Sequence, residues 1–110
     1  MGSFIKGGVV VVPFPFSDLS STKKRPALVL TSLDGDDVIL CQITATLPTN
    51  DKYAVAIKQN DFSSGSLNTD SYIRTDKIFT ADSNIVLYQA AQINSTKMTE
   101  VIDKLCDLFY

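Results

Sequence analysis

Short apolar segments separated by polar stretches run through most of the chain, a pattern typical of a β-rich domain. The pattern predicts strands at residues 7–12, 26–31, 38–44, 53–57, 71–74 and 77–79. The last two are expected to meet at a kink at Thr75-Asp76, and residues 85–89 fit either a strand or a short helix.

Polar and proline-containing stretches predict how these strands end and connect. Pro13 and Pro15 are expected to end the first strand, because proline has no backbone N–H to donate to a ladder. Asp34-Gly35 is a turn dipeptide, and it predicts a hairpin between the second and third strands. Polar loops or flexible connections are expected at residues 17–24, 45–52 and 63–66.

The C-terminus has a different periodicity. From Met98 to Phe109, apolar side chains recur at helical spacing with charged side chains between them. We therefore expect one amphipathic helix over residues 96–109, capped by Ser95 or Thr96. Many short strands followed by one helix predict a mostly β single domain, residues 1–110, built as a small SH3-like β-barrel closed by the helix.

The composition narrows the possible chemistry. The chain has 110 residues, of which 45 % are hydrophobic and 20 % charged, as is typical of one globular domain. The longest apolar run is too short to span a membrane and does not resemble a signal peptide, so a cytoplasmic location is expected. There is no histidine, and Cys41 and Cys106 lie in apolar patterns typical of buried reduced thiols. No metal site is expected, because Asp34, Asp36 and Asp37 fit ordinary turn chemistry.

A net charge of −2 would by itself disfavour a nucleic-acid partner, but the distribution of positive charge matters more than the sum. Lys23, Lys24 and Arg25 stand in a row. Pro26 biases Arg25 toward an extended backbone, and the planar guanidinium offers five donors suited to phosphate. The alternative interpretation is a solvated loop cation.

Other candidate groups lie at the ends of the predicted strands. Thr44 is either a hydroxyl that donates to a phosphate or simply a β-branched strand end. Arg74 and Asp76 are two residues apart, so in a strand they face the same side. They are either a surface ion pair worth at most about 1 kcal/mol or a phosphate-binding arginine beside a general base. The aromatic residues that could stack on bases, although most aromatics in a small barrel belong to the core, are Tyr53, Phe62, Tyr72, Phe79 and Tyr88.

Three segments resemble the MazF/PemK family of toxins, whose fold is shared by CcdB. The first is Gly-Gly-Val-Val-Val-Val-Pro-Phe-Pro-Phe-Ser-Asp-Leu-Ser at residues 7–20, followed by Lys-Lys-Arg-Pro-Ala-Leu-Val-Leu at residues 23–30. The second is Cys-Gln-Ile-Thr at residues 41–44, and the third, residues 71–80, contains an Arg-x-Asp pattern. With the terminal helix, the resemblance covers nearly the whole chain.

The resemblance implies a sequence-specific endoribonuclease that cuts single-stranded mRNA without a metal or cofactor, leaving a 2′,3′-cyclic phosphate and a 5′-OH. The implied catalytic residues are Arg25, Thr44 and Asp76, and the implied RNA-binding residues are Ser17, Lys23, Lys24, Arg74 and Lys77. Asp76 would be the general base, although a carboxylate with an ordinary pKa of about 3.9 is a weak one. The family also implies a homodimer with RNA bound across its interface, inhibited by a MazE-like antitoxin with an acidic tail.

The sequence departs from the family pattern in two places. Many members have an acidic residue where Gly8 stands, and some have a histidine or Glu-Gln in the loop before the arginine. A non-catalytic barrel that binds nucleic acid or protein therefore stays open as an alternative. A gyrase poison like CcdB is disfavoured, because the chain lacks tryptophan and ends in Leu108-Phe109-Tyr110.

Overall fold

The computed structural model describes residues 4–14, 23–46 and 52–110. The strands in these ranges are β1 (Gly8–Phe14), β2 (Lys23–Ser32), β3 (Asp37–Thr44), β4 (Ala54–Ile57), β5 (Phe62–Gly65), β6 (Ser71–Asp82) and β7 (Tyr88–Ile93). Two 3₁₀ turns, η1 (Gln59–Asp61) and η2 (Ser83–Ile85), precede β5 and β7, and helix α1 (Ser95–Phe109) follows β7. The prediction of a mostly β chain with a C-terminal helix is therefore confirmed.

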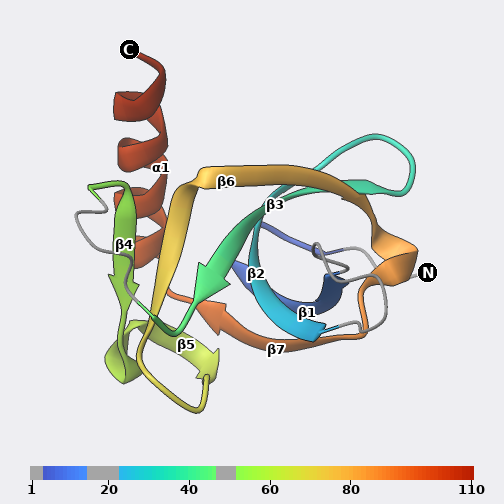
Figure 1. Ribbon diagram of the computed structural model, residues 1–110, viewed down its shortest axis with the longest axis horizontal. Helices are drawn as coiled ribbons and strands as arrows, with labels where there is room; N and C mark the ends of the chain where they lie inside the picture. Colours follow the sequence, from blue (N-terminus) through green and yellow to red (C-terminus); the bar gives the residue numbers. More distant parts are fainter. Residues whose placement is uncertain (1–3, 15–22, 47–51) are drawn as a thin grey trace.

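The strands form one antiparallel sheet in the order β4-β6-β3-β2-β1-β7-β5. The sheet curls round on itself, and α1 stands beside β4 and β6 (Figure 1). Within the described ranges β4 and β5 are the outer strands, so the sheet has the form of an open half-barrel. The expected hairpin joins β2 to β3, and Gly35 in its turn has a φ of 82°, which favours glycine.

The central strands are buried on both faces, which explains why their sequences are continuously apolar instead of alternating. One cluster, the helix-side core, includes Val9, Leu28, Cys41, Ile43 and Ile73 together with Met98, Val101 and Leu105 of α1. The other, the opposite core, consists of Val10, Val12, Ala27, Val29, Val38, Leu40 and Ala81. Neighbouring residues of one strand thus belong to different cores.

Helix α1 begins one residue earlier than expected and has a different cap. The side chain of Asn94 accepts a hydrogen bond from the backbone N–H of Lys97 at 2.8 Å, so the prediction of Ser95 or Thr96 as the cap is wrong. A cap residue needs an extended backbone, and Asn94, with φ −76° and ψ 167°, has one. Cys106 is exposed on α1, contrary to the expectation of a buried thiol, whereas Cys41 is buried as expected.

The first two strands extend beyond their predicted ends. Pro13 does not end β1, because Pro13 pairs with Lys24 and Phe14 pairs with Lys23. Since β1 pairs with β7 only as far as Val11, Pro13 lies where β1 has a single neighbouring strand, and such edge positions tolerate proline. The Lys-Lys-Arg triplet is consequently part of β2, where a loop was expected for residues 23 and 24.

Two later predictions also need correction. Residues 63–65, expected to be a flexible connection, belong to β5, in which Ser64 and Gly65 pair with β7. Gly65 has a φ of 66°, and a Cβ there would meet the backbone of Ala90 and Ala91, so this close approach of two strands requires glycine. Residues 71–82 form the single strand β6 in place of two short strands. The segment at 85–89 spans the end of η2 and the start of β7.

Candidate functional site

Arg25 and Thr44 lie on the same face of the sheet. Side chains alternate along a strand, so Arg25 shares its face with Ala27, and Thr44 shares its face with Leu40, both in the opposite core. The pairing of β2 with β3 reaches Ala27 and Gln42, and the same register extended by two residues along both strands would set Arg25 across from Thr44. Directly opposed side chains on adjacent strands have their Cβ atoms about 5 Å apart.

β6 brings a third set of side chains to this face. Thr44 pairs with Tyr72, which places these two side chains side by side. Ile73 points into the helix-side core, so Tyr72 and Arg74 point to the other face. We call the group of side chains gathered at this end of the sheet the site face: Arg25, Gln42, Thr44, Tyr72 and Arg74.

A wide bulge in β6 shapes the site face. Ile43 pairs with Ile73 but Cys41 pairs with Ile78, so residues 74–77 all lie opposite the single residue Gln42. The extra residues interrupt the ladder and bend the strand at this point. The kink expected at residues 75–76 from the sequence is this bulge.

Two hydrogen bonds fix the backbone of the bulge. The Thr75 side chain is fully buried, and its Oγ1 donates to the carbonyl of Tyr53 at 2.6 Å. The Cys41 thiol donates to the carbonyl of Arg74 at 2.8 Å. Burial alternates from Ile73 to Asp76, with Thr75 inward and its two neighbours outward. Arg74 and Asp76 therefore flank an anchored residue.

The chemistry of the Cys41 thiol is consistent with a structural role. Burial raises its pKa to about 12, and the negative charge of Asp76 adds to the effect. The thiol is therefore protonated at neutral pH and serves as a hydrogen-bond donor. The influence of Asp76 also indicates that its carboxylate lies near the Cys41 end of the bulge, although Asp76 itself is exposed.

The arginines and Thr44 present groups suited to an anion. Arg25 and Arg74 are half-buried, and their Nε atoms are shielded from solvent, so the base of each guanidinium is held inside the protein. The Thr44 hydroxyl accepts a hydrogen bond from the backbone N–H of Thr46 at 3.2 Å, which leaves its proton available for donation. Two guanidinium groups and a hydroxyl on one face form a donor set that matches a phosphodiester.

The other predicted RNA-binding residues are more dispersed. Lys24 is exposed but points to the face opposite to that of Arg25, because adjacent strand residues alternate. Lys77 is exposed within the bulge of β6. The backbone of Lys23 starts β2, and Ser17 lies outside the described residues, as does the rest of the loop before Lys23.

Gln42 belongs to the site face although it was not among the predicted site residues. The available signal was the two-residue spacing between Gln42 and Thr44 in one strand.

Gly8 lies at the far end of β1 from the Val12–Arg25 pair. A side chain at Gly8 would meet Oε1 of Gln89 and the carbonyl of Ile5, both at 3.3 Å, so this departure from the family pattern does not touch the site face.

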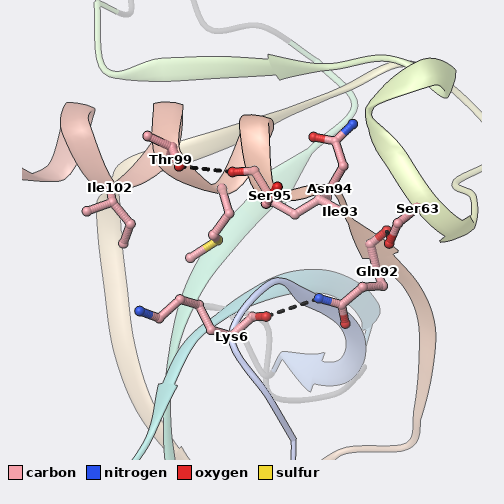
Figure 2. Close-up of a pocket in the computed structure, with 9 residues that line it drawn as sticks. Lys6, Ser63, Gln92, Ile93, Asn94, Ser95, Thr99 and Ile102 are labelled. Atoms are coloured by element: carbon pink, nitrogen blue, oxygen red, sulfur yellow. Dashed lines mark hydrogen bonds between the residues drawn. The ribbon is translucent and has the colours of Figure 1, made fainter.

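A separate groove of about 670 Å³ lies between β7 and the first turns of α1 (Figure 2). Gln92 Nε2 donates to the carbonyl of Lys6 at 3.0 Å on one side of it, and Thr99 Oγ1 donates to the carbonyl of Ser95 at 3.0 Å on the other. None of the predicted site residues lines this groove. In the described ranges, no three cysteine, aspartate or glutamate side chains gather closely enough to hold a metal ion.

Solved structures with the same fold are toxins and endoribonucleases. An endoribonuclease in complex with its cognate antitoxin, from a mycobacterial species, is 16 % identical, with a TM-score of 0.76 over 97 % of this chain and 95 % of that one. MazF from Deinococcus radiodurans is 20 % identical, with a TM-score of 0.75 over 99 % of this chain and 98 % of that one. The Mycobacterium tuberculosis toxin MazF-mt6 is 17 % identical, with a TM-score of 0.72 over 93 % and 95 %. At these identities the likeness establishes the fold.

No curated protein matches the chain at the level of sequence. No helix in the described residues is both long and apolar enough to cross a membrane. The match to a protein family, in contrast, spans residues 5–109. It includes all the strands, the bulge of β6 and the helix. The chain belongs to the family of PemK-like, MazF-like toxins of type II toxin–antitoxin systems.

Proposed function

We propose that this protein is an endoribonuclease that cleaves single-stranded mRNA at a specific short sequence, without a metal ion, and so inhibits translation and growth. The observation that carries the proposal is the gathering of Arg25, Thr44 and Arg74 on one face, beside a bulge that also holds Asp76. Such a donor set suits the phosphodiester of RNA. The structural neighbours include proteins described as endoribonucleases.

The proposed reaction uses the 2′-OH of the substrate as the nucleophile. Asp76 takes the proton of that hydroxyl as its oxygen forms a bond to phosphorus, and the bond from phosphorus to the 5′-oxygen breaks. The 5′-oxygen takes up one proton, so the products are a 2′,3′-cyclic phosphate and a 5′-OH. Arg25 and Arg74 stabilise the additional negative charge of the phosphorane, and Thr44 donates to a phosphoryl oxygen. The arginines thus supply positive charge at the reacting phosphate.

The proposal extends to the assembly of the protein. We expect a homodimer with RNA bound across its interface, and neutralisation by a cognate antitoxin whose acidic tail covers the positive site face. Structural neighbours from a mycobacterium and from Deinococcus radiodurans have been solved in complexes of toxin with antitoxin. For a protein that acts on mRNA we expect a cytoplasmic location. We also propose that α1 closes the half-barrel sheet into a small SH3-like barrel.

The test is cleavage of a long unstructured RNA in EDTA, with the new 5′ ends mapped. We expect discrete cuts at one recurring short sequence, and about a 100- to 1,000-fold loss of rate in Arg25→Ala, since a charge-stabilising donor is removed. Arg25→Lys keeps the positive charge but loses the planar guanidinium with its paired N–H donors. Its cleavage rate should therefore lie between those of Arg25→Ala and the wild type. Lys104→Ala, which removes a positive charge from α1, is the matched control.

The outcomes separate the candidate functions. Cuts that persist in Arg25→Ala would contradict the proposed site. RNA binding without any cutting by the wild type would instead favour a non-catalytic nucleic-acid-binding barrel. Cutting that disappears in EDTA and returns with Mg²⁺ would contradict the metal-independent reaction.

A further inference from the structure

A second groove lies on the face of β2 that points away from Arg25. It has a volume of about 550 Å³, and its lining includes Val11, Lys24, Pro26, Leu67, Asn68 and Tyr88. Ligand sites in proteins commonly measure about 300 to 1,000 Å³, so the groove is large enough for one nucleotide. It shares no lining residue with the groove beside α1.

The sheet register sets the geometry of this groove. Tyr88 pairs with Val11, and Val11 pairs with Pro26, so these side chains form a row across three strands. Lys24 is two residues further along β2 on the same face. With strands about 4.8 Å apart and a rise of about 3.4 Å per residue, the Cα atoms of Tyr88 and Lys24 are roughly 12 Å apart. The side chains of a tyrosine and a lysine are long enough to approach the two ends of a nucleotide placed between them.

The chemistry of the lining matches the parts of a nucleotide. Tyr88 is 57 % exposed, so a face of its ring is open for a base to stack on. The ammonium group of Lys24 suits a phosphate, and the amide of Asn68 can both donate to and accept from the edge of a base. None of the lining residues is acidic, in a chain whose net charge is −2.

The wall opposite the sheet is held in place before any ligand binds. Residues 66–68 follow β5, whose last residue, Gly65, lies against the backbone of Ala90 and Ala91. Gln59 Nε2 also donates to the carbonyl of Leu67 at 3.0 Å. A preformed groove lowers the conformational entropy cost of binding.

Two neighbouring residues at the start of β2 belong one to the groove and the other to the site face. Lys24 and Arg25 are neighbours on one strand and point to opposite faces. An RNA strand that passes over this end of β2 can therefore place one phosphate at Arg25 and a neighbouring nucleotide in the groove. A nucleic acid strand is the class of ligand that fits both the lack of acidic lining residues and the position of Lys24 next to Arg25.

We propose that the groove is a subsite for a nucleotide that flanks the scissile phosphate, with its base on Tyr88 and its phosphate at Lys24. The proposal rests on the proposed nuclease function. It assigns Lys24 and Tyr88 to one nucleotide, so that together they set how far the recognised sequence extends and strengthen RNA binding without taking part in bond cleavage. Tyr88→Ala and Lys24→Ala should therefore raise KM and leave kcat unchanged.

The first test compares the kinetics of cleavage of a long RNA with those of a short RNA that contains the scissile phosphate but lacks the neighbouring nucleotide expected in the groove. Tyr88→Ala should raise KM for the long RNA by about 5- to 100-fold, whereas Tyr88→Phe, which keeps the ring, should not. Tyr110→Ala removes an exposed tyrosine elsewhere and is the matched control. For the short RNA, the wild type and Tyr88→Ala should have the same high KM.

The second test measures binding separately from cleavage. A 2′-O-methyl oligonucleotide of the same sequence lacks the nucleophile, so its Kd reports binding alone. Lys24→Ala should reduce the slope of log Kd against log salt concentration by about 0.7, as expected for one lost phosphate contact with a single strand. Lys104→Ala should leave the slope unchanged.

The two proposals fail in different ways. If the wild type cuts RNA but Lys24→Ala and Tyr88→Ala retain its KM, Kd and salt dependence, the subsite is refuted and the nuclease stands. An equal fall in kcat for both variants at unchanged KM would also refute the subsite. If the wild type cuts no RNA, the nuclease is refuted.

Discussion

Replacing Thr75 by valine tests how the bulge of β6 positions the site. Valine has nearly the same shape as threonine but lacks the hydroxyl, so the substitution removes the 2.6 Å hydrogen bond from Oγ1 to the carbonyl of Tyr53. The same carbonyl also accepts a longer hydrogen bond from the backbone N–H of Thr75, at 3.4 Å. The Thr75 side chain is fully buried, so the valine side chain fills the position from which the hydroxyl donates.

The expected cost follows from this burial. Removing the shorter of these two hydrogen bonds leaves the carbonyl less well satisfied, and the cost of a fully unpaired buried group, about 1–3 kcal/mol, sets the scale. We expect Thr75→Val to lower the free energy of unfolding by about 2 kcal/mol, which corresponds to roughly 8 °C in Tm for a domain of this size. Urea and thermal unfolding measure both quantities. Thr75→Ser keeps the hydroxyl and loses one methyl group, so it should cost only about 1 kcal/mol.

The same substitution should slow RNA cleavage at temperatures where the variant is fully folded. Arg74 and Asp76 flank Thr75, and a displacement of about 1 Å in a reacting group can cost about 100-fold in rate. We therefore expect kcat in the EDTA assay to fall by about 10- to 100-fold in Thr75→Val and to stay near the wild-type value in Thr75→Ser. If Thr75→Ser is instead the less stable and less active variant, packing of the methyl group fixes the bulge, and the hydrogen-bond argument is wrong.

Four other predictions follow from particular groups in the fold. At pH 8 a thiol reagent should label Cys106 rapidly and Cys41 only after unfolding, because Cys106 is exposed and burial raises the pKa of Cys41 to about 12. Since the folded state holds the Cys41 proton more tightly than the unfolded chain, this contribution to stability is complete below pH 9 and falls by up to about 1.4 kcal/mol per unit as the pH rises toward 12. Urea titrations of Cys41→Ala should lack this part of the decline. Gly65→Ala should cost about 2 kcal/mol or more in thermal unfolding, because of its φ of 66° and its contact with the β7 backbone. Asn94→Ala should cost about 1 kcal/mol through loss of the α1 cap.

Three of these predictions can be contradicted by a single measurement. Equal labelling of both thiols in the folded protein would show that Cys41 is accessible. A Gly65→Ala variant as stable as the wild type would mean that β5 can move away from β7 at no cost. An unchanged melting temperature for Asn94→Ala would mean that water caps α1 as well as the asparagine does.

The strands and the helix could be predicted because their patterns are local. The apolar runs identified β1, β2 and β3, and the spacing of Met98, Val101 and Leu105 identified α1. The prediction that Pro13 ends β1 was wrong, because the effect of a proline depends on how many neighbouring strands pair with its strand at that point. β5 was missed for a similar reason, since residues 63–65 have no apolar pattern, and Ser64 and Gly65 pair only because β7 lies beside them.

The site was partly predictable for related reasons. The two-residue spacing of Arg74 and Asp76 is visible in the sequence, but the bulge that holds them depends on the register between β3 and β6. The row of three basic residues suggested a single patch. Strand alternation instead sends Lys24 to the face opposite to that of Arg25, and this could not be inferred while residues 23 and 24 were assigned to a loop.

The two-sided burial of the central strands also has a consequence for motion. β1, β2 and β3 have neither an outer edge in the sheet nor a solvent-exposed face along most of their length, so their amide hydrogens can exchange with solvent only when the whole domain opens. β4 and β5, at the two edges, can open locally. Arg25 and Thr44 extend from the slowly exchanging strands, so the backbone that carries them keeps its geometry when RNA binds. Most of the conformational entropy lost on binding is therefore lost by the flexible RNA strand and not by the protein.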